Sequence, residues 1–331
     1  MQAIVLAAGE GRRLRPLTTH APKPLVPVLN RPLLEHHLAA LRALGITDVL
    51  VNTHHAPERL HAHFGDGSAF GVHITWRHEA TLTGPAGAMR AFEDLLRPGP
   101  LLVLSGDGLH DIDLAALIAR HERRAPCLTV VLAEVDRAGR YGVATVDPDG
   151  LVRSFEEKPA WARDRRGLVS CGVYCLDAGL LPRVPAGAVY DFGEHLIPEL
   201  VAAGEPVLGL VHAGYWQDIG TVETFWRSNL DALTGRVRLP RATAAIAGAL
   251  VSEEATVSPA ATIDGDVLVG PRACVGPGAA VHGPSVIGPD CVIEAGAIVD
   301  RSVLLPRGVV PSGAGVVNGV VFAHDGGRVV L

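Results

Sequence analysis

The chain has 331 residues, of which 48% are hydrophobic and 19% are charged, and its formal net charge is −6. This length favours two domains, and the hydrophobic content is sufficient to bury a core in each. The negative charge argues against nucleic acid as the main partner, because binding to a phosphate backbone normally requires a basic face.

Neither secretion nor a membrane anchor is indicated. No signal-peptide pattern follows Met1 and no apolar run approaches about twenty residues, so we predict a cytoplasmic protein that does not bind membranes. The five cysteines form no CxxC pair, and their odd number leaves one unpaired in any disulfide scheme. Free thiols are therefore expected.

The N-terminal stretch has the pattern of a phosphate-binding strand and loop. An apolar run over Ala3–Ala8, typical of a buried strand, leads into Gly9 and Gly11. Glycines let backbone N–H groups approach phosphate oxygens, while Arg13 and Lys23 would supply positive charge. The alternative is an ordinary turn with surface charges. Prolines on both sides of Lys23 favour the phosphate site, because they restrict where the ammonium group points.

Beyond this stretch the chain alternates between predicted helices and strands. Asn30 is expected to cap a helix that has Pro32 in its first turn and ends at Gly45. Further helices are predicted at 57–64 and 84–96, and strands at 48–53, 72–76 and 101–105. Strand, helix and strand in succession form a βαβ unit, so we predict a doubly wound, Rossmann-like α/β domain.

The predicted strand at 101–105 runs into Gly106 and Asp107. Ligands of such folds bind at the carboxyl ends of parallel strands, where Gly9 and Asp107 both fall. A carboxylate there is well placed to hold Mg²⁺ beside a triphosphate. Capping of the next helix is the alternative role, but Asp111 or Asp113 lies closer to its start.

The second half of this region is richer in strands. Strands are predicted at 128–135, 141–146, 151–155, 168–176 and 207–211, with a hairpin turn at Asp149-Gly150. Helices are predicted at 192–203 and 222–233. The stretch 236–248 lacks periodicity and is predicted to be a linker.

An aliphatic residue at every sixth position is the strongest structural pattern in the chain. The series runs through Val251, Val257, Ile263, Val269, Val275, Val281, Ile287, Ile293, Val299 and Leu305. Such hexapeptide repeats place one aliphatic residue inward on each side of a triangular coil, which predicts a small left-handed parallel β-helix of roughly three coils. Pro311 occupies the next position, so the last coil is expected to change there.

Short motifs before the repeats carry a family resemblance. They are Gly9–Thr18, Pro22–Leu25, Gly84–Gly87, Ser105–Asp107, Tyr141–Val143, Glu157–Pro159, Cys171–Tyr174 and Trp216–Thr221. Together they resemble the signature of the sugar-1-phosphate nucleotidyltransferases, which make NDP-sugars from an NTP and a sugar 1-phosphate and release pyrophosphate. The sequence PKPLVP with a short β-helix tail is most similar to the mannose-1-phosphate guanylyltransferases, also called GDP-mannose pyrophosphorylases.

The resemblance implies domains and site residues. The catalytic domain would span 1–235, a linker 236–250 and the β-helix domain 251–331. Catalysis would involve Arg13, Lys23, Asp107 and Asp218, of which Asp107 and Asp218 would hold Mg²⁺. The nucleotide would contact Leu6, Ala7, Ala8, Gly9, Gly11, Arg13 and Gly87. The sugar phosphate would contact Gly142, Glu157, Lys158 and Gly172.

Physical chemistry supports such a site without a general base. A phosphate monoester loses its second proton near pH 6, so the sugar phosphate is already largely a dianion at neutral pH. The site must overcome repulsion between this dianion and the triphosphate, which Arg13, Lys23, Lys158 and Mg²⁺ would do by positive charge and positioning. We therefore expect in-line attack on the α-phosphorus.

Several positions depart from the family pattern and leave the substrates open. They are Ala8, Arg12, Pro85, Gly108, Ser170 and Cys171. GTP with mannose 1-phosphate or a related sugar is the first expectation; the alternatives are a UTP- or dTTP-using glucose-1-phosphate type and a catalytically silent regulatory subunit. The β-helix is expected to mediate homo-oligomerisation, since its coil ends and flat sides are natural pairing surfaces.

Other readings of the sequence are weaker. Leu14 interrupts a GxGxxG dinucleotide motif, and no GxxxxGK[ST] motif occurs. The histidine pairs lack the Cys or carboxylate spacing of a metal site. His282 suggests a hexapeptide acyltransferase, but about three coils is short for that activity.

Overall fold

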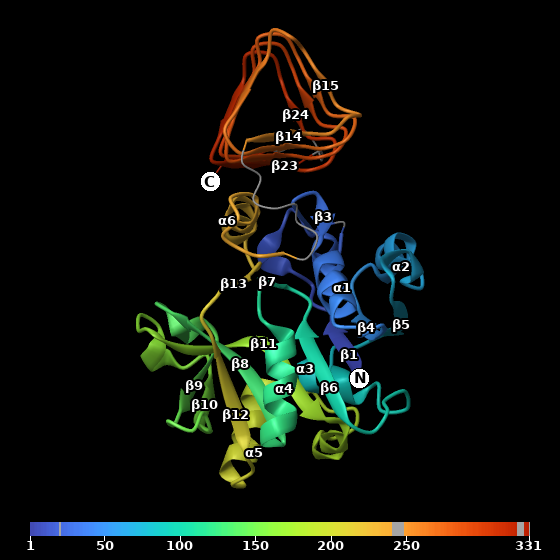
Figure 1. Cartoon of the computed structure of the whole chain (residues 1–331), viewed down its shortest axis with the longest axis vertical. Helices are drawn as coiled ribbons and strands as arrows, with labels where there is room; N and C mark the ends of the chain where they lie inside the picture. The colour runs from blue at the N-terminus through green and yellow to red at the C-terminus, as the bar shows by residue number, and fades with distance from the viewer. Residues whose placement is uncertain (20, 240–247, 323–327, 331) are drawn as a thin grey trace. The chain divides into compact units, whose positions relative to one another are not determined.

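The computed structural model describes residues 1–19, 21–239, 248–322 and 328–330 (Figure 1). Their contacts divide the chain into two compact units. The first comprises Met1–Glu10, Ala21–Pro24 and His37–Asp218, and the second comprises Gly11–His20, Leu25–His36 and Ile219–Leu331. The predicted linker falls partly on 240–247, outside the described residues, and the predicted domain bounds stay a prediction.

In the described part of the first unit, a nine-stranded mixed sheet forms the centre, with the strand order β10-β9-β11-β6-β1-β4-β5 and with β8 between β11 and β12. The strands are β1 (Gln2–Leu6), β4 (Asp48–Thr53), β5 (His73–His78), β6 (Pro100–Ser105), β8 (Leu128–Val135), β9 (Gly142–Val146), β10 (Val152–Glu157), β11 (Gly167–Asp177) and β12 (Val207–His212). β1, β4, β5 and β6 run parallel, and β11 is antiparallel to β6.

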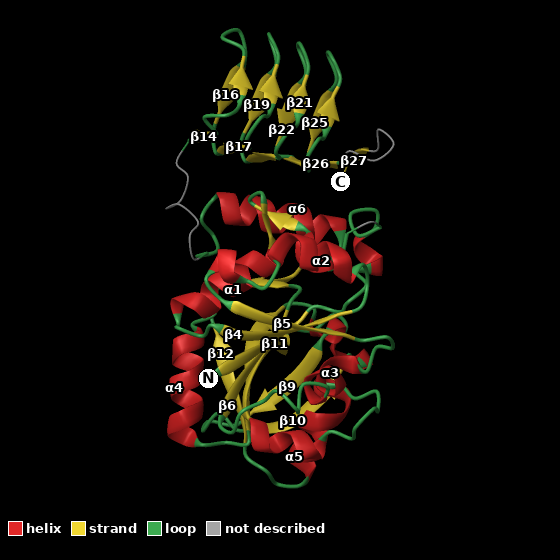
Figure 2. Ribbon diagram, turned by 90° about the vertical axis from the view of Figure 1, so that its right-hand side faces the viewer, coloured by secondary structure: helices red, strands yellow, loops and turns green. Residues whose placement is uncertain are grey.

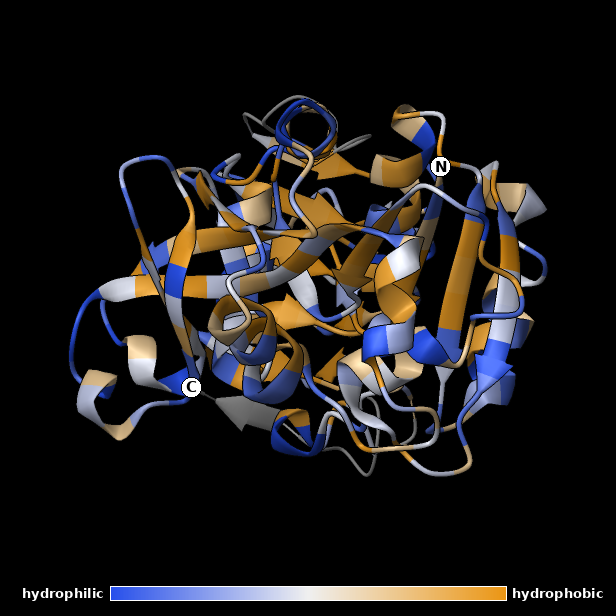
Figure 3. Ribbon diagram, turned by 90° about the horizontal axis from the view of Figure 1, so that it is seen from below, coloured by the Kyte–Doolittle hydropathy of each residue, from blue (hydrophilic) through white to orange (hydrophobic). Residues whose placement is uncertain are grey.

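Helices cover both faces of this sheet. Their bounds are α1 (Leu33–Ala43), α2 (Pro57–Phe64), α3 (Gly84–Arg90), α4 (Leu114–Arg124) and α5 (Ile197–Ala202). Figure 2 shows α4 on one side of the sheet and α3 and α5 on the other. The strands are hydrophobic along much of their length (Figure 3), because side chains on both faces are buried under helices. The predicted Rossmann-like α/β class is confirmed.

Local patterns predict some elements to the residue and others only in part. The predictions at 48–53, 57–64 and 128–135 coincide with β4, α2 and β8. α3 ends at Arg90 rather than at residue 96, because the chain then turns to bury Phe92 completely. The predicted helix at 192–203 begins as a short π-helix, Phe192–Leu196, before α5.

The predicted role of Asn30 as a helix cap is wrong. Residues 27–32 form a hairpin in which β2 (Pro27–Val28) pairs with β3 (Arg31–Pro32). Leu29 and Asn30 form its turn, with φ of 50° and 63°, and α1 begins only at Leu33. Two successive left-handed residues are the conformation of a type I′ hairpin turn. Asn tolerates it well, so the turn preference of Asn30 prevails over its capping preference.

The second unit contains α6 (Val222–Leu233) and the β-helix. The β-helix strands form three sheets, which are the sides of the triangular coils in Figure 1. One sheet has the order β14-β17-β20-β23-β26-β27, and the others β15-β18-β21-β24 and β16-β19-β22-β25. The strand bounds are β14 (Ala249–Val251), β15 (Thr256–Val257), β16 (Thr262–Asp264), β17 (Val267–Val269), β18 (Cys274–Val275), β19 (Ala280–His282), β20 (Ser285–Ile287), β21 (Val292–Ile293), β22 (Ile298–Asp300), β23 (Val303–Leu304), β24 (Val309–Val310), β25 (Gly315–Val317), β26 (Gly319–Val321) and β27 (Arg328–Val330).

The six-residue period slips by one residue after Val299. Val299 is buried, but the next inward residue is Leu304, which is fully buried, and not the predicted Leu305. Ile287 accordingly pairs with Leu304, whereas the preceding coil pairs Val269 with Ile287. The turn before β23 is one residue shorter, with Arg301 in the left-handed region.

After the slip, the period continues in its new phase through Val316. Val310 and Val316 are buried, so Pro311 falls outside the inward series and does not end it. Four strands stack on each of two sides among the described residues. The described part of the β-helix is therefore about one coil longer than the roughly three coils predicted.

The slip can be tested with a matched pair of neighbouring leucines. Leu304→Ala leaves a cavity in the β-helix core, whereas Leu305→Ala trims a half-buried side chain. We expect Leu304→Ala to lower the free energy of unfolding by at least about 1 kcal/mol more than Leu305→Ala, as measured by denaturant titration. The opposite order would restore the phase read from the sequence.

All five cysteines are unpaired. No helix among the described residues is both long and apolar enough to cross a bilayer.

Candidate functional site

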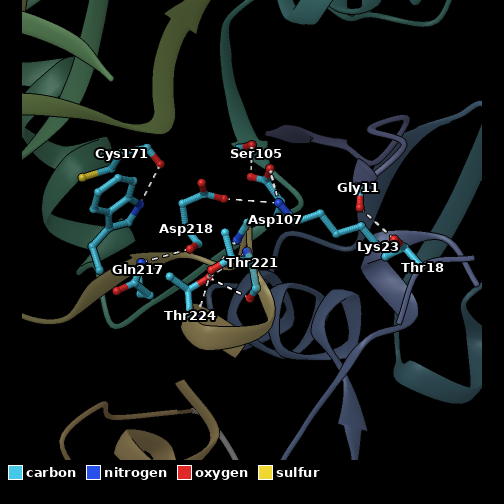
Figure 4. Close-up of polar contacts among 12 residues, drawn as sticks. Gly11, Thr18, Lys23, Ser105, Asp107, Cys171, Gln217, Asp218, Thr221 and Thr224 are labelled. Atoms are coloured by element: carbon cyan, nitrogen blue, oxygen red, sulfur yellow. Dashed lines mark hydrogen bonds and ion pairs between the residues drawn. The ribbon is translucent and has the colours of Figure 1, made fainter. Parts of the chain in front are cut away.

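Three predicted site residues from distant parts of the chain meet in the first unit. The Nζ atom of Lys23 lies 2.8 Å from Oδ2 of Asp107 and 3.2 Å from Oδ1 of Asp218 (Figure 4). The Lys23 side chain is 7% exposed, so this ammonium group depends on the two carboxylates to offset its loss of water.

Each of the three residues lies at one end of, or just beyond, a short secondary-structure element. Lys23 begins a single 3₁₀ turn, Lys23–Leu25, and Asp107 follows the end of β6. Asp218 ends the short strand β13 (Trp216–Asp218), which pairs with β7 (Gly108–His110) so that Asp218 lies opposite Gly108. This antiparallel pairing brings together residues more than a hundred positions apart.

The charges of the cluster stabilise one another. Although burial lowers the pKa of Lys23, Asp107 and then Asp218 raise it above its ordinary value. Burial raises the pKa of Asp107, but the neighbouring Lys23 lowers it further, to about 2. Both groups are therefore charged at neutral pH.

The loop that carries Asp107 is fixed by close contacts. Ser105 Oγ donates a hydrogen bond of 2.6 Å to Oδ1 of Asp107. The Gly106 amide donates to the carbonyl oxygen of Leu6, and a Cβ atom on Gly106 would lie only 2.8 Å from that oxygen. Glycine is required there, so Asp107 is held at a fixed position between the carboxyl ends of β1 and β6.

A pocket of about 230 Å³ opens beside this cluster, at the carboxyl ends of β1, β4 and β6 and the start of α3. Its lining residues are Leu6, Ala7, Ala8, Gly9, Lys23, Pro24, Asn52, Glu79, Leu82, Gly84, Pro85, Ala88, Ser105, Gly106 and Asp107. The predicted nucleotide residues Leu6 to Gly9 thus form one wall. Gly87 is not among the lining residues, because its amide bonds to the Tyr190 carbonyl and its Cα faces Ala188 and Thr83.

Two buried polar residues of this pocket, Asn52 and Glu79, were not predicted from the sequence. Asn52 Oδ1 accepts a hydrogen bond of 2.6 Å from the Ala7 amide, and its Nδ2 donates to Oε1 of Glu79 at 2.5 Å. Oε2 of Glu79 accepts from the amide and hydroxyl of Thr83, at 3.1 and 2.8 Å. Asn52 is the last residue but one of the predicted strand 48–53, and Glu79 comes three residues after the predicted strand 72–76. The strand-end rule that pointed to Asp107 could therefore have found both.

The predicted sugar-facing residues lie on neighbouring strands of the same unit. A Cβ atom on Gly142 would be 2.7 Å from Oε2 of Glu157, so this glycine makes room for the carboxylate. Lys158 Nζ lies 2.7 Å from Oε1 of Glu157, and the hydrogen bond raises the pKa of Lys158. Gly172 has a φ of 69°, and a Cβ atom on it would lie 2.7 Å from Cβ of Ser105.

Positions that depart from the family pattern adjoin these residues. Trp216 Nε1 donates to the Cys171 carbonyl at 3.0 Å (Figure 4), and Ser170 Oγ lies 3.1 Å from the Tyr174 hydroxyl. The strand of Gly172 therefore approaches Ser105 on one side and the strand of Asp218 on another.

Gly11 and Arg13 belong to the second unit. Gly11 has a φ of 62° and accepts a hydrogen bond from the Thr18 hydroxyl at 2.7 Å (Figure 4). Arg13 lies in a 3₁₀ turn, Arg12–Leu14. Their binding of the triphosphate stays a prediction.

The carboxylates fit a magnesium ion whose coordination would be completed by substrate phosphates. Carboxylate oxygens from Asp107 and Asp218 converge on one cation, the Lys23 ammonium. Mg²⁺ is usually held by one or two carboxylates together with substrate phosphates. No group of three or more His, Cys, Asp or Glu side chains suited to a metal occurs among the described residues.

Comparisons with known proteins converge on one family. The family model described as nucleotidyl transferase matches residues 2–235, which end two residues after α6. A UTP–glucose-1-phosphate uridylyltransferase of Synechocystis is 31% identical over 251 residues, covering 72% of this chain. A mannose-1-phosphate guanylyltransferase of Mycobacterium tuberculosis is 34% identical over 266 residues, covering 80% of it. The matches span 65% of the Synechocystis protein, just under two thirds, and 74% of the other.

Solved structures agree with the fold. A putative glucose-1-phosphate thymidylyltransferase of Bacillus anthracis, in complex with a sucrose, has a TM-score of 0.62 at 27% identity and covers 69% of this chain and 94% of its own. HddC of Yersinia pseudotuberculosis, complexed with GMP-PN, has a TM-score of 0.59 at 22% identity over 69% and 97% of the two chains, which supports the fold alone.

Proposed function

The chain belongs to the nucleotidyl transferase family, and we propose that it transfers a nucleotidyl group from an NTP to a sugar 1-phosphate. The observation that carries the proposal is the cluster of Lys23, Asp107 and Asp218 at the edge of a pocket. A buried cation between two convergent carboxylates suits chemistry in which phosphate charge has to be offset.

In this reaction an oxygen of the sugar phosphate attacks the α-phosphorus of the NTP. A new P–O bond forms, the bond from the α-phosphorus to the bridging oxygen breaks, and pyrophosphate leaves with the electron pair. Lys23 would stabilise charge at the reacting phosphate, Arg13 would hold the triphosphate, and Lys158 the sugar phosphate. Asp107 and Asp218 would hold Mg²⁺, which supplies further positive charge when bound.

The pocket supports GTP as the nucleotide. Apolar side chains of Leu6, Leu82 and Pro85 suit the faces of a base, and Glu79 is a buried group that can only accept hydrogen bonds. Guanine offers N–H donors at two adjacent ring positions, whereas uracil and thymine flank their single N–H with carbonyl oxygens that a carboxylate repels. Glu79 therefore favours guanine, and mannose 1-phosphate or a related sugar is proposed with it.

The identity to a uridylyltransferase favours a second candidate, a UTP- or dTTP-using enzyme. A screen of pyrophosphate release with Mg²⁺ separates the candidates, with GTP, UTP, dTTP, ATP and CTP each tested against several sugar 1-phosphates. We expect the fastest release with GTP. Release with UTP or dTTP instead would establish the second candidate, and no release with any pair would favour a silent regulatory subunit.

A conservative change at Glu79 tests the role of its carboxylate. Glu79→Gln keeps the size of the side chain but introduces a donor, so we expect the ratio of kcat/KM for GTP to that for UTP to fall about tenfold or more. Because both rates are measured on one sample, the ratio does not depend on how much protein is folded. Glu93→Gln, at an exposed carboxylate, is the matched control. An unchanged ratio in Glu79→Gln would remove Glu79 from base selection.

Further proposals concern the whole protein. We propose a catalytic domain at 1–235, a linker at 236–250 and a β-helix domain at 251–331, in a cytoplasmic homo-oligomer. Exposed aliphatic side chains on the outer faces of the β-helix, at Ile298, Val309 and Val317, support pairing through that domain. Light scattering that shows a monomer would contradict it.

A further inference from the structure

The hairpin that follows Lys23 contains residues in an energetically unfavourable backbone conformation. Leu29 is in the left-handed region, with a φ of 50°, directly before Asn30 at 63°. For a residue such as leucine this conformation costs roughly 1–2 kcal/mol. It persists only where the surroundings hold it.

A buried asparagine of α6 holds the hairpin from one side. Oδ1 of Asn229 accepts a hydrogen bond of 2.9 Å from the Leu29 amide, and its Nδ2 donates to the Pro27 carbonyl at 3.2 Å. Asn229 has no exposed surface. Loss of these bonds would leave buried polar groups unsatisfied, so the contact is strongly favoured.

The β-helix holds the same turn from another side. Nδ2 of Asn30 donates a hydrogen bond of 2.9 Å to the carbonyl oxygen of Ile287, which also accepts from the Gly270 amide at 2.8 Å. Gly270 leaves the space for this contact, because a Cβ atom there would lie 3.1 Å from Nδ2 of Asn30.

α6 and the β-helix are also bonded directly. Trp226 Nε1 donates to the Arg301 carbonyl at 2.7 Å, in the short turn that causes the phase slip. The hairpin, α6 and the β-helix are thus joined by hydrogen bonds between each pair.

Two residues of the proposed site are continuous in sequence with this assembly. Lys23 lies just before the hairpin, and Asp218 lies just before Thr221, which caps α6. We propose that the β-helix positions the segment that carries Lys23, with Asn30 as the positioning residue. This inference rests on the proposed function and adds a catalytic consequence to a domain predicted only to mediate assembly.

The test uses Asn30→Asp, which keeps the size of the side chain but turns an oxygen toward the Ile287 carbonyl. We expect kcat to fall about tenfold or more, since small displacements of catalytic groups are costly, with the KM for nucleotide nearly unchanged. Asn318→Asp is the matched control. Asn318 also has a left-handed backbone, with a φ of 52°, and its substitution adds the same charge within the β-helix. An equal loss in both variants would overturn the proposal.

A double-mutant cycle tests whether the effect passes through Lys23. In a Lys23→Ala background, Asn30→Asp is expected to cause no further loss of kcat, whereas a full additional loss would show an unrelated effect and overturn the proposal. Should Asn30→Asp not fold, Asn30→Gly removes the same hydrogen bond while suiting the left-handed backbone.

A readout without substrate keeps this inference separate from the proposed function. Amide hydrogen exchange over residues 23–29 is expected to quicken in Asn30→Asp or Asn30→Gly relative to the wild type. If the wild type released no pyrophosphate, the proposed function would fail. Faster exchange in the Asn30 variants would still support the proposal that the β-helix positions the segment that carries Lys23. If the wild type were active but exchange were unchanged in the Asn30 variants, only the positioning of the Lys23 segment by the β-helix would be overturned.

Discussion

Lys23→Ala is expected to lower turnover about a hundredfold or more while leaving the fold intact, judged by the loss of comparable electrostatic groups at other active sites. The substitution removes a buried cation that contacts both Asp107 and Asp218. The carboxylates would then face each other, and the reacting phosphate would lose its nearest proposed positive charge. Steady-state kinetics of pyrophosphate release, with thermal unfolding as the check on folding, measures the effect.

Arg227→Ala is the matched control for Lys23→Ala, because it removes an exposed cation that is paired with Glu223 on α6. It should leave turnover unchanged, since exposed ion pairs contribute little. Near-normal turnover in Lys23→Ala would contradict the assignment of this cluster as the active site.

Asp107→Asn is expected to lower turnover by a similar factor, about a hundredfold or more, because it halves the carboxylate set proposed for Mg²⁺. Asp113→Asn makes the same chemical change at the cap of α4, where Asn caps equally well, and should be silent. A raised Mg²⁺ requirement in Asp107→Asn but not in Asp113→Asn would support the metal role. Equal activity of the two variants would contradict it.

The dependence of the reaction rate on pH follows from the pKa values of Asp107 and Lys23. Because the pKa of Asp107 is lowered to about 2, its carboxylate stays ionised well below neutral pH, and the raised pKa of Lys23 keeps the ammonium charged well above it. Loss of rate on the acid side should therefore set in near pH 6, where the sugar phosphate gains its second proton. Asp107→Asn should lower the whole profile without moving that limb.

Local pattern predicts the elements but not all of the site. Asp107 could be found because it lies just past the end of a buried strand, and Asn52 and Glu79 lie close to the ends of β4 and β5. Asp218 could be paired with Asp107 only by family resemblance, because the pairing of β13 with β7 joins residues far apart in sequence. No local period reports such a contact.

Asn30 and Leu305 show the opposite case, in which a good local rule loses to tertiary structure. Asn30 with Pro32 two residues later has the pattern of a helix start, yet the turn that Asn30 makes is held by Ile287 of the β-helix. The repeat placed Leu305 inward, but a turn shortened by one residue turned Leu304 inward instead. Both outcomes depend on contacts across the fold.

The different burial of the two proposed lysines has a practical consequence for chemical labelling. The sequence contains two lysines, Lys23 and Lys158, with side chains 7% and 63% exposed. Acylating reagents need a neutral, accessible amine, and Lys23 offers neither in the folded protein. Besides the terminal amine of Met1, such a reagent would therefore find Lys158, and a fluorophore attached there would sit on the proposed sugar-phosphate contact. Because acylation removes the positive charge of that amine, sugar phosphate and reagent would compete for Lys158, so slower labelling of Lys158 in the presence of sugar phosphate would report its binding.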